Sequence, residues 1–200
     1  MTAISVYVHK KKIPVLKVWD GLGVALILAY GVARLGCHFA GDGDYGTPTK
    51  LPWGTIYANG TAKPTTMLKE YFESHPEERA AWSYDSLSVI PSRTDKLGYQ
   101  VNRFDEETPL HPTPVYEMIM GIIGFLIMLT LRKNDYPDGK IFMIYLMLAS
   151  TFRFIVEFLR LQPRIFAGLS EAQLISIVLF IAGFIGMTYF GQKRESTPTT

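Results

Sequence analysis

The chain has 200 residues, of which 48% are hydrophobic, with a mean hydropathy of only +0.14 and a formal net charge of +2. The net charge alone says little, but residues 41–110 carry eleven acidic and seven basic residues, which argues against nucleic acid as a partner. The single cysteine, Cys37, excludes an intrachain disulfide framework and any metal site built from several cysteines.

The apolar residues are gathered into four blocks, at residues 21–39, 115–131, 141–161 and 174–190. Each block is close to the ~20 residues that a helix needs to cross ~30 Å of hydrocarbon. We therefore predict an all-α membrane protein, with residues 1–200 forming a single integral membrane domain of about four transmembrane helices. The alternative is a soluble protein with buried core helices, and the uninterrupted apolar stretch 175–187 argues against it.

The basic residues predict the orientation of these spans. They precede the first span, lie between the second and third, and follow the fourth: Lys10, Lys11, Lys12, Arg132, Lys133, Lys140, Lys193 and Arg194. Positively charged loops remain on the cytoplasmic side, so both termini are predicted inside and residues 41–110 form an insertion on the outer side.

The outer segment is predicted to be mostly irregular and to contain one short helix. Residues 41–66 are rich in glycine and proline, which favour turns. Residues 66–81 have helical character, with Thr65 or Thr66 as the N-terminal cap. The aromatic residues of 83–107 follow no clear period.

Charged residues within the third span are the most informative feature of the chain. Arg153 and Glu157 are four residues apart, hence on one helix face, and Arg160 is predicted one turn further along it. Charges at this depth are costly, so they pair with each other or line a substrate path. A purely structural Arg-Glu pair remains the alternative.

Arg34 lies near the outer end of the first span, beside Gly31 and Gly36, which permit close approach of another backbone. The third span climbs toward the same side, so two or three guanidinium groups are expected to converge there. The planar guanidinium is suited to phosphate, and a lipid headgroup supplies phosphate at this depth. A snorkelling Arg34 without a ligand is the alternative.

The glycine-rich loop after Arg34 contains Asp42 and Asp44. Its Asp-x-Asp spacing suggests a cation site, but the further ligands of a calcium loop are missing. We predict no metal, and expect one carboxylate to pair with an arginine while the glycines allow a tight turn, including Gly46.

Further polar residues are predicted near the outer interface. His111, Tyr116 and Glu117 lie at the start of the second span, and His38 lies near the end of the first. A histidine here acts as a base or hydrogen-bonds a neighbouring backbone. We expect a shared polar cavity, with Cys37 as a packing residue.

Three motifs together resemble the prolipoprotein diacylglyceryl transferase family. The first, residues 33–46, is similar to Gly-Arg-x-Gly-Asn followed by Gly-Glu and an aromatic-Gly pair. The second, residues 111–117, is similar to His-Pro-x-x-x-Tyr-Glu. The third, residues 152–160, is similar to Phe-Arg-x-x-x-Glu-Phe-x-Arg. Their order and membrane placement agree with the family, and they cover most of the chain outside the outer segment.

The resemblance implies transfer of diacylglyceryl from phosphatidylglycerol to the lipobox cysteine thiol of a prolipoprotein, in the bacterial inner membrane and without a cofactor. It implies that Arg34 and Arg153 hold the lipid phosphate and that Glu157 orients Arg153 or assists proton movement. It also implies a set of substrate-binding residues: Gly36, Asp42, Gly46, His111, Tyr116, Glu117 and Arg160. The acceptor thiol comes from the substrate, so Cys37 is not required as a nucleophile.

The chain departs from the family at several places. Cys37 replaces the family's asparagine, one extra residue separates Arg34 from Gly46, and the family's upstream spans with their His-Gly-Gly motif are absent from the sequence. A partner could supply those spans. The alternatives are a catalytically silent subunit that binds lipid or lipoprotein, and an unrelated small transporter.

Overall fold

The computed structural model describes residues 2–77, 93–94, 100–101, 108–161 and 165–195. Within these ranges the regular secondary structure is helical apart from one antiparallel pair of two-residue strands, β1 (Arg93–Thr94) and β2 (Gln100–Val101), and residues 41–63 are mostly irregular. Four helices are long and apolar enough to cross a membrane: α2 (Val15–Ala40), α7 (Thr113–Leu131), α8 (Lys140–Val156, extended by the 3-10 turn η1, Glu157–Leu159) and α9 (Glu171–Glu195). The prediction of an all-α, multi-pass membrane protein is confirmed.

The chain divides into two compact units. The helical unit contains Met1–Val32, Met118–Ile155 and Glu171–Thr200, and the loop unit contains Ala33–Glu117 and Val156–Ser170. Sequence analysis predicted one membrane domain with an insertion at 41–110. The loop unit includes that insertion together with the final turns of α2, the start of α7 and the connection between α8 and α9.

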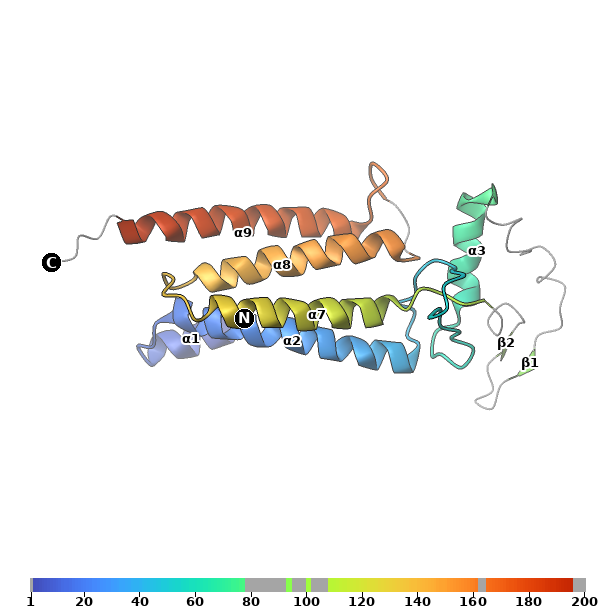
Figure 1. Ribbon diagram of the computed structural model, residues 1–200, viewed down its shortest axis with the longest axis horizontal. Coiled ribbons are helices and arrows are strands. Elements are labelled where there is room, and N and C mark those ends of the chain that lie inside the picture. The colour runs from blue at the N-terminus through green and yellow to red at the C-terminus, as the bar shows by residue number, and fades with distance from the viewer. Residues whose placement is uncertain (1, 78–92, 95–99, 102–107, 162–164, 196–200) are drawn as a thin grey trace. The chain divides into compact units, whose positions relative to one another are not determined.

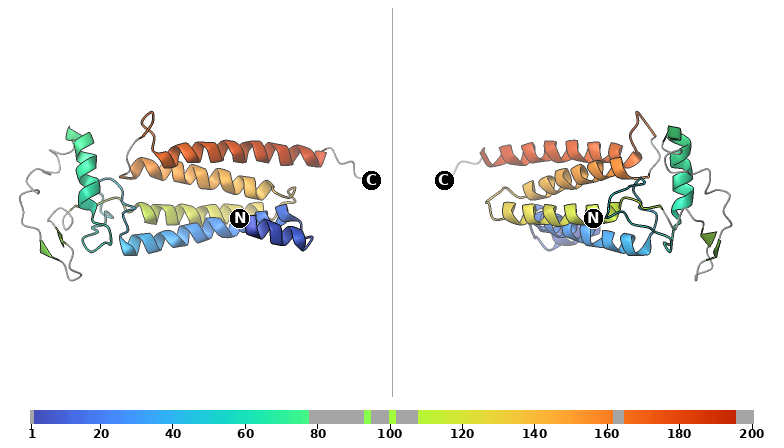
Figure 2. Two further views of the ribbon diagram at one scale, coloured as in Figure 1. Left: turned by 180° about the vertical axis from the view of Figure 1, so that it is seen from behind. Right: turned by 45° about the vertical axis from the view of Figure 1, so that its right-hand side comes forward.

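In the helical unit, α2, α7, α8 and α9 lie side by side with nearly parallel axes (Figures 1 and 2). Small residues allow the helices to approach closely. A Cβ atom added to Gly121 of α7 would lie 2.7 Å from the Cα atom of Gly31 of α2, and one added to Gly183 of α9 would lie 2.8 Å from Cγ of Met147 in α8. Such contacts replace the hydrophobic driving force that helices lack in lipid.

A side chain from α2 caps the start of α8. The Asp20 carboxylate accepts hydrogen bonds from the backbone N–H groups of Gly139, at 2.7 Å, and Phe142, at 2.8 Å. The first amides of a helix have no partner within the helix, and its N-terminus favours negative charge. The acidic residue at the beginning of the first span therefore has a structural role.

Two short helices differ from the sequence predictions. Helix α1 (Thr2–Lys10) was not predicted. Helix α3 (Pro64–Ser74) begins two residues before the predicted start, and its N-cap is Lys63 in extended conformation, without a side-chain cap. The predicted cap at Thr65 or Thr66 is therefore wrong, because Pro64 already occupies the first turn, where its missing N–H costs nothing. The backbone of His75 (φ −132°, ψ 70°) interrupts the predicted helix, and residues 78–81 lie outside the described range.

The core of the loop unit is a cluster of buried apolar side chains: Tyr45, Tyr57, Leu68, Phe72, Leu110 and Leu161. Isolated bridges join short extended segments of this unit. Gly46 bridges to Arg160, and Leu110 bridges to both Pro48 and Thr55. These pairings satisfy the backbone of an irregular region and place residues far apart in the sequence next to one another.

Candidate functional site

Arg34 and Asp44 form the first part of a network of ionised side chains in the loop unit. Arg34 lies in the last turns of α2, and Asp44 lies in the glycine loop that follows. One terminal nitrogen of the Arg34 guanidinium pairs with the Asp44 carboxylate, and its Nε atom lies 2.8 Å from Oε2 of Glu117, which is in the first turns of α7. The expected pairing of a loop carboxylate with an arginine is therefore present.

Arg160 forms the second part of the network. Its guanidinium pairs with the other oxygen of Asp44, lies 3.7 Å from Oε1 of Glu117 and lies 3.8 Å from Oε2 of Glu157. The Arg160 and Glu117 side chains are each only 2% exposed, whereas Asp44 is 22% exposed. Asp44 thus bridges two guanidinium groups at the more accessible edge of a buried network.

The network contains three carboxylates and two guanidinium groups. Glu157, itself buried, also accepts a hydrogen bond from the Ser170 hydroxyl at 2.8 Å. Five charges held this closely stabilise one another only when their hydrogen bonds are also satisfied. Both arginines are thus engaged by carboxylates instead of forming a bare cationic pocket.

The backbone around Gly46 positions this network. The Gly46 N–H donates to the carbonyl oxygen of His111 at 3.0 Å, and the Thr47 N–H donates to that of Leu159 at 2.8 Å. A Cβ atom on Gly46 would lie 2.5 Å from Cβ of His111 and 2.9 Å from the Leu159 carbonyl oxygen. Only glycine permits this approach, so the predicted site residue Gly46 acts through its missing side chain.

The predicted position of Arg160 on a helix face is wrong. The α-helix ends at Val156, and Arg160 has an extended backbone with φ −89° and ψ 146°. The reason is tertiary, because the Leu161 N–H donates to the carbonyl oxygen of Tyr45 at 3.1 Å. Arg160 therefore reaches Asp44 from a bridging segment instead of from a helical turn.

Arg153 lies in α8 within the helical unit, whereas Glu157 and Arg160 belong to the loop unit. Its predicted contact with lipid phosphate, and its orientation by Glu157, stay predictions. Within the loop unit, Glu157 pairs with Arg160 and Ser170.

His111, Tyr116 and Trp53 form a chain of hydrogen bonds. The indole N–H of Trp53 donates to the Tyr116 hydroxyl at 2.8 Å, and that hydroxyl lies 3.0 Å from Nδ1 of His111. An indole N–H can only donate, so the hydroxyl oxygen accepts this bond. Because His111 Nδ1 is the other neighbour of the hydroxyl among the described residues, we assign the hydroxyl proton to the bond with Nδ1.

This arrangement selects one form of the His111 ring. Because Nδ1 accepts the Tyr116 hydroxyl proton, the neutral ring carries its own proton on Nε2. Burial also lowers the pKa of His111 below the ordinary 6.5, which favours the same neutral form. His111 is thus a hydrogen-bond donor through Nε2. Sequence analysis identified His111 and Tyr116 but not Trp53, because nothing in the local sequence around Trp53 points to residues about 60 positions away.

Among the described residues, Asp42 and Gly36, two predicted substrate-binding residues, make no contact in the ion-pair network. Asp42 is exposed, and Asp44, which was not among the predicted substrate-binding residues, is the carboxylate that bridges the two arginines. No described atom lies within 4 Å of a Cβ placed on Gly36, so the expected close approach at Gly36 is wrong. The close backbone approach is found at Gly31, as predicted.

Cys37, Asp42 and Asp44 bring their ligand atoms within 4.8 Å of one another. Two guanidinium groups already bind the Asp44 carboxylate. Their positive charge opposes a cation at the same place, so this geometry does not favour a metal site.

His38, near the end of α2, lies with Nδ1 3.0 Å from the hydroxyl of Tyr57, and burial raises the pKa of Tyr57 to about 12. Tyr57 therefore remains protonated and has a structural role.

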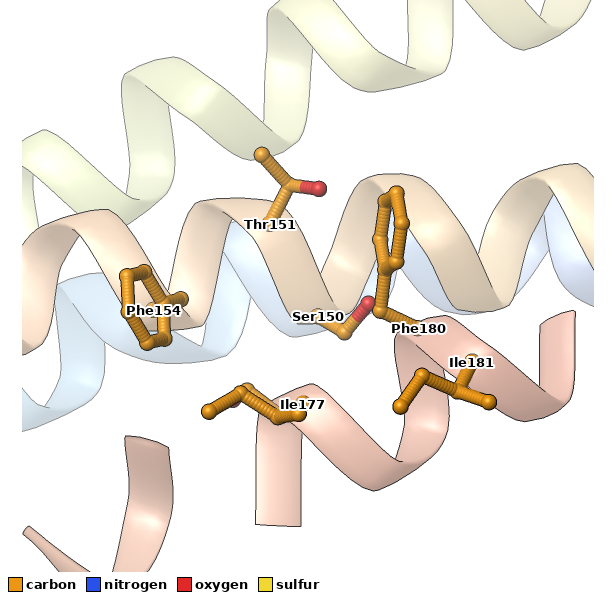
Figure 3. A pocket seen from close by; sticks show the side chains of 7 residues that line it. Ser150, Thr151, Phe154, Ile177, Phe180 and Ile181 are labelled. Atoms are coloured by element: carbon orange, nitrogen blue, oxygen red, sulfur yellow. The ribbon is translucent and has the colours of Figure 1, made fainter. Parts of the chain in front are cut away.

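An apolar cavity of about 210 Å³ lies between α8 and α9 in the helical unit (Figure 3). Its lining residues are Ser150, Thr151, Phe154, Ser176, Ile177, Phe180 and Ile181. The three hydroxyl groups do not make it polar, because each donates to a backbone carbonyl of its own helix at 2.7 to 3.0 Å. This cavity can hold hydrocarbon but has no group for acid-base chemistry.

Comparisons with known proteins agree with the resemblance of the three motifs. The family model for prolipoprotein diacylglyceryl transferase matches residues 1–189. The phosphatidylglycerol-prolipoprotein diacylglyceryl transferase of Clostridium tetani is 30% identical over 184 residues, covering 90% of this chain and 57% of that protein. Those of Proteus mirabilis and Clostridioides difficile are 27% and 26% identical, over 92% and 96% of this chain and 67% and 57% of theirs.

The chain thus spans somewhat more than half the length of most of these relatives. The match nevertheless extends over nearly the whole chain and includes all three motifs. This chain belongs to the prolipoprotein diacylglyceryl transferase family.

Proposed function

We propose that this chain takes part in the transfer of diacylglyceryl from phosphatidylglycerol to the cysteine thiol of a prolipoprotein. The observation that carries this proposal is the network of Arg34, Asp44 and Arg160, in which two guanidinium groups are fixed on one carboxylate in a chain of this family. Guanidinium groups fixed in advance stabilise a phosphate that gains charge during a reaction.

The reaction requires one new bond and one broken bond. The sulfur atom of the substrate cysteine bonds to the terminal glycerol carbon of diacylglycerol, and the bond from that carbon to the phosphate oxygen breaks. Glycerol phosphate leaves with the electron pair, and the thiol proton is released to a base or to water. Because negative charge grows on the phosphate oxygen, the protein accelerates this step most by holding that oxygen.

Arg34 is the best candidate for the phosphate contact. Its side chain is 18% exposed, whereas Arg160 is 2% exposed and pairs with buried carboxylates. Arg160 then positions Asp44 and Glu117, which in turn orient Arg34. His111 supplies a further N–H donor through Nε2, and Arg153 is proposed as a second phosphate ligand.

The carboxylates that engage Arg34 and Arg160 have a consequence for binding, because an incoming phosphate must compete with them for the guanidinium groups. Asp44 is the most exposed of the three carboxylates. We therefore propose that the phosphate binds on the Asp44 side of Arg34, where it competes with Asp44 for the guanidinium.

The apolar cavity between α8 and α9 supports the lipid part of the proposal. It lies between two helices that can span a membrane. It offers a ligand only hydrocarbon and hydroxyl groups that already donate to backbone carbonyls. An acyl chain of the donor lipid fits this chemistry.

The proposed location is the bacterial cytoplasmic membrane. The distribution of lysine and arginine supports a cytoplasmic location for both chain termini. The loop unit, with the ion-pair network, then faces the outer side, where the lipobox of a translocated prolipoprotein is presented.

The direct test is transfer of labelled diacylglyceryl from phosphatidylglycerol to a synthetic lipobox peptide by the purified chain in nanodiscs. Arg34→Ala and Arg153→Ala are expected to abolish thioether formation while the protein remains folded. Arg132→Ala, at an exposed arginine of the α7–α8 turn, is the matched control and should retain activity. Normal transfer by both Arg34→Ala and Arg153→Ala would contradict the assignment.

A second candidate function is binding of lipid or lipoprotein without turnover. It is favoured by one observation, the engagement of both Arg34 and Arg160 by carboxylates, which fits a site that holds a ligand without reacting with it. Retention of phosphatidylglycerol by folded chain without transfer, measured by native mass spectrometry, would support it. Recovery of transfer after co-expression with the upstream spans of a relative would instead identify a partner that completes the enzyme. Family membership favours both of these functions over an unrelated transporter.

A further inference from the structure

The connection between α8 and α9 contains a tight hairpin turn at residues 165–169. The Ile165 N–H donates to the carbonyl oxygen of Leu169 at 2.9 Å, and the Leu169 N–H donates to that of Phe166 at 2.9 Å. The two central residues, Ala167 and Gly168, have φ values of +50° and +73°. Positive φ at both central positions defines the type I′ turn that closes a two-residue hairpin.

This turn presents large apolar side chains outward. Ile165 is 65% exposed and Phe166 is 69% exposed, and the turn itself, Ile-Phe-Ala-Gly-Leu, contains no polar side chain. Single exposed apolar residues are common on protein surfaces, but Ile165 and Phe166 are adjacent and together form a small exposed apolar patch at a hydrogen-bonded turn.

The ends of the connection are fixed. On one side the Leu161 N–H donates to the carbonyl oxygen of Tyr45 at 3.1 Å, and on the other the Ser170 hydroxyl donates to the buried Glu157 carboxylate at 2.8 Å. Both contacts lie within the loop unit. The residues that flank the turn are therefore hydrogen-bonded to the segments that form the ion-pair network.

The position of the turn along the chain keeps it close to a bilayer. Ile165 is six residues from Leu159, where one spanning helix ends, and six from Glu171, where the next begins. Six extended residues reach at most roughly 20 Å, and a chain folded into a hairpin reaches less. The apolar tip thus stays within reach of the membrane surface at all times.

We propose that the turn at residues 165–169 inserts its Ile165 and Phe166 side chains into the membrane interface on the side of the loop unit. Its partner is the lipid surface, specifically the boundary between headgroups and acyl chains. The free-energy cost of moving the turn into the interface is small because the N–H groups of Ile165, Phe166 and Leu169 are already hydrogen-bonded within the turn. The gain is burial of two large apolar side chains that water otherwise contacts.

Insertion of the turn anchors the α8–α9 connection, which contributes residues to the ion-pair network, at the bilayer surface. Glu157 and Arg160 lie before the turn in the same connection, and Ser170 directly follows it. The depth of the network relative to lipid headgroups is then set by the protein's own apolar anchor.

The experiment uses the single cysteine of the chain. In a Cys37→Ser background, Phe166→Cys carries a nitroxide label in nanodiscs of phosphatidylethanolamine and phosphatidylglycerol, and Ser74→Cys, at the exposed polar end of α3, is the matched control. At position 166 we expect collision with dissolved oxygen, which concentrates in lipid, to exceed collision with a water-soluble nickel chelate by several-fold. At position 74 the order is reversed. Equal access of the nickel chelate to both positions would overturn the proposal.

A second measurement leaves the chain unaltered. The Ile165 side-chain methyl signals of the wild-type protein in nanodiscs should broaden when a lipid with a nitroxide near its headgroup is added, and should remain sharp with a soluble gadolinium chelate. Broadening by the gadolinium chelate alone overturns insertion. Protection of this methyl group only after a lipobox peptide is added also overturns it, because the turn would then bind peptide instead of lipid. Neither measurement depends on transfer activity, so failure here leaves the proposed function untouched.

Discussion

The helical unit and the loop unit are stabilised in different ways. In the helical unit, α2 and α7 meet where Gly31 lies against Gly121, and the contact is made by backbone atoms without side-chain charges. The loop unit has, in addition to its apolar core, ion pairs between residues of distant segments, with Arg34, Asp44 and Arg160 at their centre. Close packing suits a region surrounded by lipid, whereas charges require a setting in which irregular backbone can bring several partners together. The ion-pair network therefore lies where the helices end.

The largest expected effect comes from removing the buried cation of the loop unit. Arg160→Met leaves the carboxylates of Asp44, Glu117 and Glu157 without this partner. Because uncompensated buried charges are costly, the free energy of unfolding should fall by about 3–5 kcal/mol. Equilibrium unfolding in detergent micelles measures this change.

The control for Arg160 is Arg132→Met, at an exposed arginine, which should change stability by less than about 0.5 kcal/mol. Equal effects of the two substitutions would show that the ion-pair network does not hold the loop unit together.

The next effect tests the packing of the helical unit. In Gly121→Ala the new methyl group meets Gly31 Cα at 2.7 Å and the carbonyl oxygen of Ile27 at 3.1 Å, so α2 and α7 must separate. Overpacking of this kind costs about 1–3 kcal/mol. Thermal unfolding should show the loss, while the ion-pair network keeps its own contacts.

Gly21→Ala is the matched control, because a Cβ there meets no described atom within 4 Å. Alanine favours a helix over glycine by about 0.8–1 kcal/mol, so this substitution should stabilise the protein. Destabilisation by both alanines would indicate that glycine flexibility, and not close approach, is what α2 and α7 require.

A smaller effect distinguishes the two acidic residues of the glycine loop. Asp44→Asn removes the negative charge shared by Arg34 and Arg160 and should cost about 1–2 kcal/mol, reduced by solvent screening because Asp44 is partly exposed. Asp42→Asn changes an exposed residue and should be neutral. If transfer activity is lost with Asp42→Asn and kept with Asp44→Asn, the position inferred for the site is incorrect.

The smallest effect concerns the hydrogen-bond chain through Tyr116. Trp53→Phe removes the N–H donor, so the Tyr116 hydroxyl no longer has to direct its proton to His111. Nitrogen NMR should find a single Nε2-protonated His111 in the wild type and a mixture of tautomers in the variant, with little change in stability. Trp19→Phe, at a residue of the helical unit that packs on Phe142, should leave the His111 signal unchanged.

The pH dependence of His111 provides a further check on the same chain. Burial lowers its pKa below 6.5, so the unfolded chain binds a proton before the folded chain does. The stability contributed by neutral His111 is therefore present above pH 6.5 and is lost as the pH falls below that value. A His111 ring that titrates above pH 6.5 in the folded wild type would contradict the neutral Nε2–H form.

Much of the fold follows from the sequence because membrane helices are encoded locally. The four apolar blocks predicted the four long helices, with errors confined to their ends, since length and hydrophobicity are sufficient to define a span. The prediction was less accurate for α3, where Pro64 at the start and the backbone of His75 at the end set the limits.

The sites of ionisable residues were also largely predictable, because charges near apolar segments are conspicuous. Arg34, Glu117, Glu157 and Arg160 were all identified from their cost in a membrane. The partner of each of these residues, however, could not be predicted from the sequence. The spacing of the loop did not distinguish Asp42 from Asp44 as the partner of an arginine, and the family resemblance pointed to Asp42. The turn at Gly41 and Gly43, with φ values of +57° and +99°, instead brings Asp44 to the arginines.

The sequence by itself therefore determined the class of the protein, its spanning helices and the residue types that must be paired, because these follow from hydrophobicity and the cost of buried charge. Only the tertiary structure decided which charges meet. Arg160 leaves the helical path because its segment pairs with Gly46, and Trp53 reaches Tyr116 across about 60 residues. Contacts between distant segments depend on the packing of the whole loop unit, and no local pattern of residues specifies them.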